Sequence, residues 1–440
     1  MTIDGQAKEP GVTGGGAADV EPYDRVRTRR VAVAGGVGTL IEYYDFSLYG
    51  YLAVVIAPLF FPGGDPVVSL LSALAVFATA YLARPLGGIV FGHIGDRFGR
   101  KRALLATLVC MGTASTVMGL LPVHDQVGVW AGVLLVVVRL AQGFSAGGEV
   151  GGSATYISEA APRRLKATFG AFTPLGSTGG FALAAAVAGT VSALTTAEQL
   201  SSWGWRIPFL LSLPLTLFCL WARTRVHETL GEEDGPQEPK APAGPPVGTL
   251  FRREPLPLLR ATALSIACNG TAYIGLTYLS IHLIQRLGYD RTPVYWVATL
   301  AIGLAALLMP LGGLLADRVG LLRVLVGGLV GFAVLTYPMM ALMGGGLGIA
   351  TVAYVVIMLN SVGVQVGAYT LLPRLFGQRT RFTGVAMGWN LGVVVAGGTA
   401  PLVAVWLIET TGNVQAPAFF VAVVAVIGLV ALLGLRERAL

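Results

Sequence analysis

The sequence is poor in charged residues. Lys, Arg, Asp and Glu make up 12% of its 440 residues, whereas apolar residues make up 54%. Soluble domains carry about 25% charged residues, so a chain of this composition cannot cover its own surface with polar groups. A lipid bilayer must therefore surround part of the molecule. This composition excludes a soluble enzyme.

Cysteine and nucleotide-binding motifs are also scarce. The three cysteines, Cys110, Cys219 and Cys268, lie far apart and each inside an apolar run. Their odd number and spacing predict neither a disulfide framework nor a metal site. No Walker phrase occurs, and no nucleophile–base pair indicates catalysis. We therefore expect no cofactor, no metal, no enzymatic activity and no transport driven by ATP.

What the chain does contain is a series of apolar runs, each of about the 20 residues that a spanning helix needs. The expected helices are 31–61, 68–96, 102–121, 127–158, 165–194, 204–227, 257–287, 293–316, 321–343, 347–373, 381–409 and 415–435. The predicted fold is therefore an all-α integral membrane protein, with twelve transmembrane helices in two six-helix bundles.

Basic residues lie in alternate connections between these helices, apart from Arg286 and Arg291. Because Lys and Arg concentrate on the cytoplasmic side of a membrane, both termini are predicted to be cytoplasmic, in the inner membrane. The net charge of +7 follows this pattern, so we expect a bilayer and not a nucleic acid as the partner.

The chain divides near its middle. A Pro-rich, mixed-charge stretch at 229–255 reads as a cytoplasmic linker between bundles at 31–228 and 256–436, and the polar residues 1–30 read as a disordered cytoplasmic tail. The phrase PLGGIVFGHIGDRFGRKR from Pro85 returns as PLGGLLADRVG from Pro310. Such a repeat is typical of a duplicated six-helix unit.

These phrases carry a resemblance to a known family. GHIGDRFGRK (Gly92 to Lys101) and RLAQGFSAGGE (Arg139 to Glu149) resemble motifs of the major facilitator superfamily. IEYYDF, ARPLGG and WGWRIPF resemble its metabolite:proton symporters, a branch with carriers for α-ketoglutarate, citrate, shikimate and proline or betaine. The resemblance implies alternating access to a central site, with protons and a small molecule as the transported species. We expect the protein to be a monomer.

The resemblance also implies a cytoplasmic gate, which latches the two halves in the outward-facing state. Its residues here are Gly92, Gly95, Asp96, Arg97, Gly99, Arg100 and Lys101, with Asp317 and Arg318 in the repeat. The alternative is that the basic residues only anchor the chain at the membrane surface and that the aspartate only caps a helix.

Charges inside the spans indicate where the mechanism lies, because each costs several kcal/mol unless it is paired or hydrated. All five lie in the N-terminal half: Glu42, Asp45, Arg84, Arg139 and Glu149. Three carboxylates face two arginines, and a carboxyl group without a full partner can carry a proton. We predict Asp45 or Glu149 as proton carrier, with Glu42 nearby, Arg139 as modulator and Arg84 for an anionic substrate group. The alternative is a structural ion-pair network.

Other polar residues are candidates for substrate contact. Arg206, between Trp203 and Trp205, is one, although interfacial anchoring explains it equally well. From the second half we expect Asn269, Tyr273 and Tyr278 on the seventh helix. Gly143, Gly147 and Gly151 form a small-residue face on the fourth helix that predicts close helix packing.

The function predicted from the sequence is secondary active transport, as proton-coupled uptake of a small organic acid or related metabolite. Two alternatives remain open at this point. One is uptake of an osmolyte such as proline or betaine. The other is a drug:proton antiporter, although GAFTPLGSTGG at Gly170–Gly180 does not match the usual helix 5 motif of those exporters.

Overall fold

The computed structural model describes residues 25–63, 65–98, 100–147, 165–229, 250, 252, 254–377 and 380–435. Throughout these residues the chain is helical, with short turns between helices and no strand. The predicted tail, apart from Arg25–Arg30, and most of the predicted linker at 229–255 lie outside the described residues.

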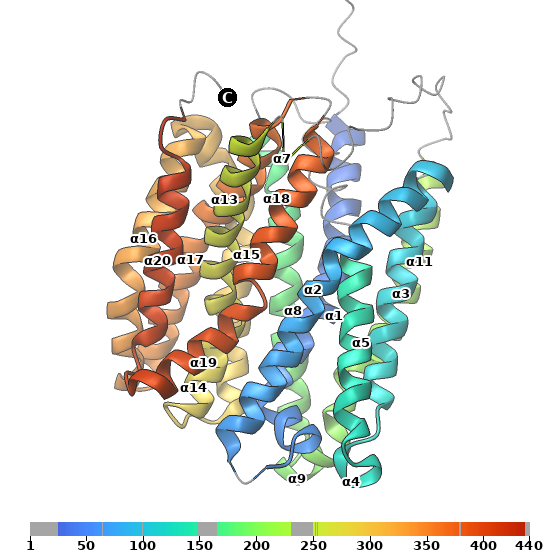
Figure 1. Ribbon diagram of the computed structural model, residues 1–440, viewed down its shortest axis with the longest axis vertical. Coiled ribbons are helices and arrows are strands. Elements are labelled where there is room, and N and C mark those ends of the chain that lie inside the picture. Colours follow the sequence, from blue (N-terminus) through green and yellow to red (C-terminus); the bar gives the residue numbers. More distant parts are fainter. Residues whose placement is uncertain are drawn as a thin grey trace, which may run out of the picture.

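The helices fall into two halves that stand side by side (Figure 1). The first contains α1 (Arg25–Phe60), α2 (Pro66–Phe98), α3 (Arg100–Leu120), α4 (His124–Val127), α5 (Trp130–Ala146), α7 (Lys166–Gly170), α8 (Phe172–Leu194), α9 (Ala197–Gln199), η1 (Leu200–Gly204), α10 (Arg206–Leu210) and α11 (Ser212–Thr229). The second contains α13 (Pro255–Tyr273), η2 (Ile274–Tyr278), α14 (Leu279–Gln285), α15 (Arg291–Val319), α16 (Leu321–Leu342), η3 (Met343–Gly345), α17 (Leu347–Leu371), η4 (Leu372–Leu375), α18 (Arg381–Ala396), α19 (Thr399–Thr411) and α20 (Ala416–Ala431).

These helices confirm the predicted membrane fold. Eight described stretches are long and apolar enough to cross a bilayer, and three shorter apolar helices accompany them. The remaining crossing is α13 to α14, which a π-helical segment, η2, interrupts. Most boundaries lie within two or three residues of the predicted ones, and α1 begins earlier, at Arg25.

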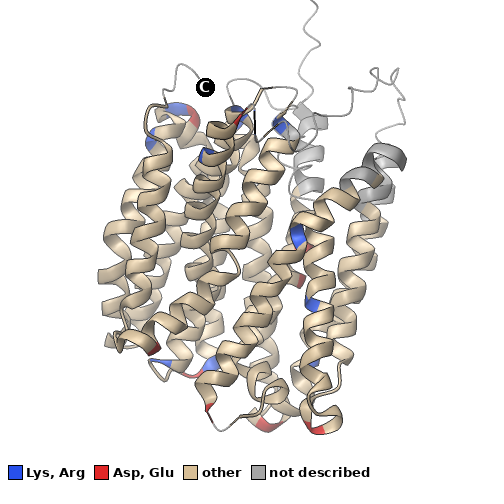
Figure 2. Ribbon diagram, in the orientation of Figure 1, with Lys and Arg blue, Asp and Glu red and all other residues tan. Residues whose placement is uncertain are grey.

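Charged residues concentrate at the two ends of the bundle, with few between (Figure 2). We call the end where α1 begins and α15 finishes the basic end. At the opposite end lies Arg286, one of the two exceptions to the alternating pattern of basic connections. It forms an ion pair with Glu409 at the end of α19.

Helices α2 and α5 approach each other more closely than side chains would allow. A Cβ atom on Gly143 would lie 1.7 Å from the backbone oxygen of Ala80, and one on Gly147 would lie 1.9 Å from that of Arg84. The predicted small-residue packing face is therefore confirmed for these two glycines, while Gly151 lies outside the described residues. This contact sets Arg84 and Arg139 on adjacent helices.

A helix break shapes the contact between the halves. The eleventh crossing, predicted as one helix over 381–409, is divided into α18 and α19 at Gly397 and Gly398. A Cβ atom on Gly398 would lie 2.0 Å from the ring of Tyr81 on α2. The absence of a side chain here lets α2 of the first half pack against α18 and α19 of the second.

Candidate substrate and proton site

Arg84 on α2 is buried and is held by aromatic rings. Its guanidinium carbon lies 4.5 Å from the ring centroid of Phe46 and 4.9 Å from that of Tyr81, and the residue is 2% exposed. Its Nε has no hydrogen-bond partner among the described residues, and Glu42 is close enough to act on it electrostatically. Ring faces attract cations without consuming their N–H donors, so these donors remain available for a ligand.

Aromatic side chains from both halves meet beside Arg84. We call the following residues the aromatic cluster: Tyr43, Tyr81, Phe181, Tyr273, Tyr369 and Trp389. Tyr273 meets the rings of Tyr81 and Phe181 edge-on, each at 5.6 Å between centroids. Tyr369 and Trp389 lie 4.6 Å apart. The cluster thus draws on α1, α2 and α8 of the first half and on α13, α17 and α18 of the second, and all of its members are buried.

Arg139 on α5 occupies a second aromatic cage. Its guanidinium carbon lies 4.8 Å from the centroid of Phe46, 4.6 Å from that of Tyr49 and 5.0 Å from that of Phe77. Its Nη1 donates to Oε1 of Gln142 at 2.8 Å. Within the described part of the chain it forms no ion pair with a carboxylate, so rings and an amide stabilise its charge.

Asp45 forms no ion pair with either arginine in the described structure. It is 1% exposed, and neither of its carboxylate oxygens accepts a hydrogen bond of standard geometry from any described residue. The hydroxyls of Ser212 and Ser115 lie close enough to act on it. A buried carboxylate with so few partners is costly in its charged form, whereas a protonated carboxyl is neutral. Glu149, the other predicted carrier, lies outside the described residues.

The remaining predicted contact residues are placed differently from Arg84. Arg206 donates from Nη1 to the backbone oxygens of Gly119 and Leu121 at 2.9 and 2.7 Å, so it ties α10 to the end of α3. Asn269 donates its amide hydrogens to Ser265 within α13. Tyr278 lies one turn beyond Tyr273 and contacts His282. Of the three candidates on the seventh crossing, the structure brings only Tyr273 into the aromatic cluster.

At the basic end, Asp317 of the second half binds the first half. Its carboxylate accepts hydrogen bonds from the backbone nitrogens of Ala167 and Thr168, at 3.0 and 2.9 Å, and from the Thr168 hydroxyl at 2.6 Å. A carboxylate at a helix N-terminus satisfies free N–H groups and the helix dipole. Arg318 beside it is exposed.

The other half of the predicted gate is described only in its backbone. Gly92, Gly95, Asp96 and Arg97 lie in the last turns of α2, and Arg100 and Lys101 lie in the first turn of α3. The side chains of these residues, and Gly99 as a whole, fall outside the described part of the chain.

At the opposite end, tyrosines join the halves across η2. The hydroxyl of Tyr51 on α1 donates to the backbone oxygen of Leu276 at 2.6 Å, and that of Tyr295 on α15 donates to the backbone oxygen of Tyr51 at 2.9 Å. Within the second half, Tyr354 donates to Gly275 at 2.6 Å. A π-helical turn displaces carbonyls from the regular helical ladder. The halves are therefore in contact on both sides of the aromatic cluster.

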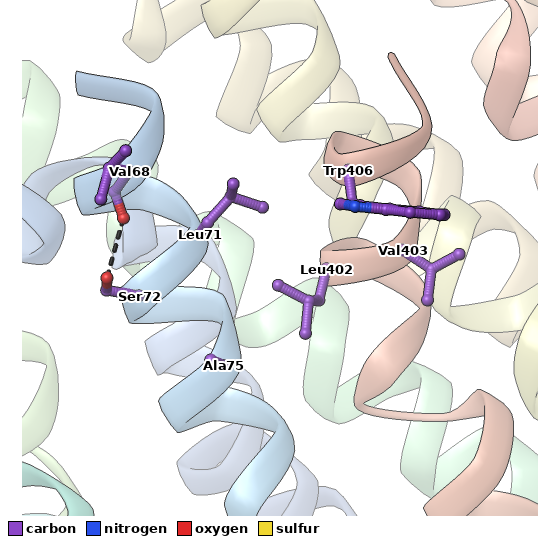
Figure 3. A pocket seen from close by; sticks show the side chains of 7 residues that line it. All are labelled: Val68, Leu71, Ser72, Ala75, Leu402, Val403 and Trp406. Atoms are coloured by element: carbon purple, nitrogen blue, oxygen red, sulfur yellow. Dashed lines mark hydrogen bonds between the residues drawn. The ribbon is translucent and has the colours of Figure 1, made fainter. Parts of the chain in front are cut away.

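A separate apolar cleft lies between α2 and α19 (Figure 3). Its lining residues are Val68, Leu71, Ser72, Ala75, Leu402, Val403 and Trp406. The only hydroxyl among them, on Ser72, donates to the backbone oxygen of Val68 at 2.8 Å. The lining includes no charged side chain, so the cleft offers no cationic partner for a carboxylate.

Comparison with known proteins agrees with this architecture. The model of the Major Facilitator Superfamily matches residues 35–390 and 262–440. The proline/betaine transporter of Escherichia coli K12 is 35% identical over 434 residues, which cover 96% of this chain and 86% of that protein. The glycine betaine/proline/ectoine/pipecolic acid transporter OusA of Dickeya dadantii is also 35% identical, with the same coverage. The inner membrane metabolite transport protein YhjE of Escherichia coli K12 is 36% identical and covers 95% of this chain and 96% of that protein.

A solved structure shows the same fold. The proton:xylose symporter XylE, bound to 6-bromo-6-deoxy-D-glucose, superposes with a TM-score of 0.72 at 16% identity, over 92% of this chain and 94% of that one. The family model and the similar transporters confirm the predicted family and the predicted transport function. The chain belongs to the major facilitator superfamily and is a multi-pass membrane transporter.

Proposed function

We propose that the protein imports a zwitterionic osmolyte of the proline or betaine type together with protons. Transport runs across the inner membrane, from the outside to the cytoplasm. Both termini lie on the cytoplasmic side, and the protein acts as a monomer. The similar proteins named as proline and betaine transporters support this substrate class. They favour the osmolyte alternative over the organic acid that the sequence analysis placed first, and over a drug antiporter.

The observation that carries the proposal is the pairing of one available arginine with neutral aromatic rings. The N–H donors of Arg84 suit a single carboxylate. The second half contributes Tyr273, Tyr369 and Trp389 to the cluster, all uncharged, and ring faces attract substituted ammonium groups. A substrate with one negative and one positive group matches this arrangement. A di- or tricarboxylate would need further cations, and Arg139 already donates hydrogen bonds to the side-chain oxygen of Gln142 and to the backbone oxygens of Phe46 and Phe77.

We assign the proton to Asp45, with Glu149 as the alternative carrier. When both substrate and proton are bound, the buried carboxyl is neutral and the substrate carboxylate is matched by Arg84. The loaded site then has less uncompensated charge than a site holding either one alone. This lowers the cost of moving the loaded site between the two faces of the membrane.

The contacts at the two ends of the bundle support alternating access. Asp317 and the first turn of α7 would separate when the halves at 31–228 and 256–436 open to the cytoplasm. The tyrosines around η2 would separate when they open to the outside. The gate residues at the end of α2 and the start of α3 are proposed to act as the counterpart of Asp317 at the basic end.

Uptake by purified protein in proteoliposomes tests the proposal. Under an imposed gradient, alkaline inside, we expect accumulation of labelled proline or glycine betaine that a protonophore abolishes. Succinate, citrate and shikimate should neither accumulate nor compete. Accumulation of an acid but of no zwitterion, or efflux of hydrophobic cations, would contradict the proposed substrate class. Accumulation driven by sodium alone would contradict the coupling ion.

A further inference from the structure

We propose that Gln142 and Ser115 are positioning residues that couple substrate binding to proton binding. They complete a relay between the two sites, formed in order by Arg84, Phe46, Arg139, Gln142, Ser115 and Asp45. The inference rests on the proposed function, because it assumes a substrate carboxylate at Arg84 and a proton at Asp45. The coupling residues themselves follow from the geometry of four packed helices.

The first part of the relay is a ring shared by two cations. The guanidinium carbons of Arg84 and Arg139 lie 4.5 and 4.8 Å from the centroid of Phe46. Both residues are fully enclosed, and like charges repel strongly where little water screens them. A change in charge at Arg84 therefore changes the electrostatic energy of the Arg139 guanidinium directly.

The second part is a chain of hydrogen bonds with a fixed direction. Arg139 has only donors, so the amide oxygen of Gln142 must face it, at 2.8 Å from Nη1. The amide nitrogen of Gln142 must then donate to Oγ of Ser115, at 2.9 Å. Because this oxygen accepts from Gln142, the hydroxyl hydrogen of Ser115 remains free for the Asp45 carboxylate, which lies close by although it accepts no hydrogen bond of standard geometry from the described residues in this structure. Hydrogen bonds in such a chain polarise one another.

Among the described residues around Asp45, this relay is the main connection between the Asp45 carboxylate and a positively charged side chain. Ser212 on α11 offers a second hydroxyl, but α11 places no charged side chain against Asp45 among the described residues. Glu42 lies one turn away on α1 and acts on Arg84. Arg139 therefore stabilises the Asp45 carboxylate through Gln142 and Ser115, and not by a direct ion pair.

This arrangement predicts the sign of the coupling. A substrate carboxylate bound to Arg84 cancels positive charge beside Phe46 and draws Arg139 toward that side. The hydrogen bonds from Arg139 to Gln142 and from Gln142 to Ser115 weaken, and the positive electrostatic potential at Asp45 falls. Both effects favour a proton on Asp45. Because coupling between two binding equilibria is reciprocal, a bound proton must also tighten substrate binding.

The test compares Gln142→Met and Ser115→Ala with the unmodified protein, in affinity for labelled substrate at pH 6 and pH 8. In the unmodified protein we expect at least about fivefold tighter binding at pH 6, the lower range of measured couplings. In both variants this ratio should fall to about one. Gradient-driven accumulation should collapse, while exchange of internal for external substrate continues. Ser115→Thr, which keeps the hydroxyl, should restore the ratio.

The matched control is Ser145→Ala. Ser145 lies on α5 three residues beyond Gln142 and donates only to Ala141 of its own helix at 3.0 Å, so the pH ratio should not change. An unaltered pH ratio in Ser115→Ala would overturn the proposal. Loss of both exchange and accumulation in correctly folded variants would also overturn it. If Gln142→Met does not yield folded protein, Ser115→Ala alone tests the proposal, because it removes only one oxygen atom. If the unmodified protein binds no zwitterion, the proposed function fails instead.

Discussion

Two buried arginines stand within the membrane domain without a direct carboxylate partner of standard geometry among the described residues. Arg84 and Arg139 are stabilised by ring faces, and they share Phe46. A cation over a desolvated ring gains about 2 kcal/mol or more per contact, so two or three rings offset much of the cost of burial. Rings also leave the charge of the arginine uncancelled, which a salt bridge would not. Such an arginine can still attract an anionic ligand.

Replacing Arg84 by Lys should raise the KM for substrate uptake about 10- to 100-fold, equivalent to about 1.4–2.8 kcal/mol. Lysine keeps the positive charge, but it loses the planar fork that binds a carboxylate with two hydrogen bonds and stacks on rings. The initial rate of uptake against substrate concentration measures this change.

Arg323→Lys is the matched control, since Arg323 is exposed on α16 and bonds only the Val319 carbonyl at 2.8 Å. We expect its KM to equal that of the unmodified protein. An unchanged KM in Arg84→Lys would remove Arg84 from the substrate site.

At this scale the sequence predicts which charges are buried, but not what holds them. Glu42, Asp45, Arg84 and Arg139 stand out because charges are rare in apolar runs. The partners of the arginines are aromatic residues, which are common in every membrane helix. Phe77, Tyr81 and Arg84 recur at helical spacing on one face of the second helix, the single signal that could have indicated the cage. Phe181 and Trp389 join the cluster only through tertiary packing.

At the scale of elements, glycine determines how closely the helices of the first half approach. Gly87 faces the backbone oxygen of Phe144, where a Cβ atom would lie 1.8 Å away, and Gly143 faces that of Ala80. Backbone atoms cannot rotate away as side chains can. Helices α2 and α5 must therefore separate if a methyl group is added, and they carry Arg84 and Arg139.

Gly143→Ala should lower the stability of the protein by about 1–3 kcal/mol, the usual cost of overpacking, and should reduce uptake. Gly327→Ala on α16 is the control, because no atom lies within 4 Å of the added methyl and alanine favours a helix over glycine. Thermal unfolding in detergent should give a lower Tm for the first variant and an equal or higher Tm for the second. The reverse order would contradict the packing account.

Asp317→Ala should loosen closure at the basic end. It removes the three hydrogen bonds that join α15 to the first turn of α7. The readout is the labelling rate of a single cysteine placed at Thr370, which lies against Gly170, in a chain whose own three cysteines are replaced. We expect labelling by an impermeant reagent, added from the cytoplasmic face, to accelerate several-fold.

Asp290→Ala provides the comparison for that variant. Asp290 precedes α15 at the opposite end, and its side chain makes no capping hydrogen bond. Labelling at position 370 should not change. Equal rates in the two variants would show that Asp317 does not hold the halves together.

Helix breaks are the part of the fold that the sequence predicts least well. Hydropathy gives continuous helices over 257–287 and 381–409, because apolar content does not reveal a local change in hydrogen bonding. The π-helical segment η2 depends on hydroxyl donors from Tyr51 and Tyr354, which lie on other helices. Only the folded molecule brings these partners together.

At the scale of the whole molecule, the two halves have unequal roles. The first half supplies every described charge at the depth of the site, and the second supplies neutral rings and the tyrosine contacts around η2. Contacts at both ends enclose the aromatic cluster. Alternating access then requires that one set of contacts breaks at a time. In the proposed mechanism, proton and substrate both bind before the halves exchange these contacts.

Simultaneous measurement of substrate and proton flux tests this account most directly. Proline or glycine betaine is added outside proteoliposomes at equal internal and external pH, and external pH is followed while substrate enters. We predict external alkalinisation for the unmodified protein. We predict none for Asp45→Asn, although that variant still exchanges internal for external substrate. Substrate entry without any proton movement in the unmodified protein, or unaltered proton flux in Asp45→Asn, would contradict the account.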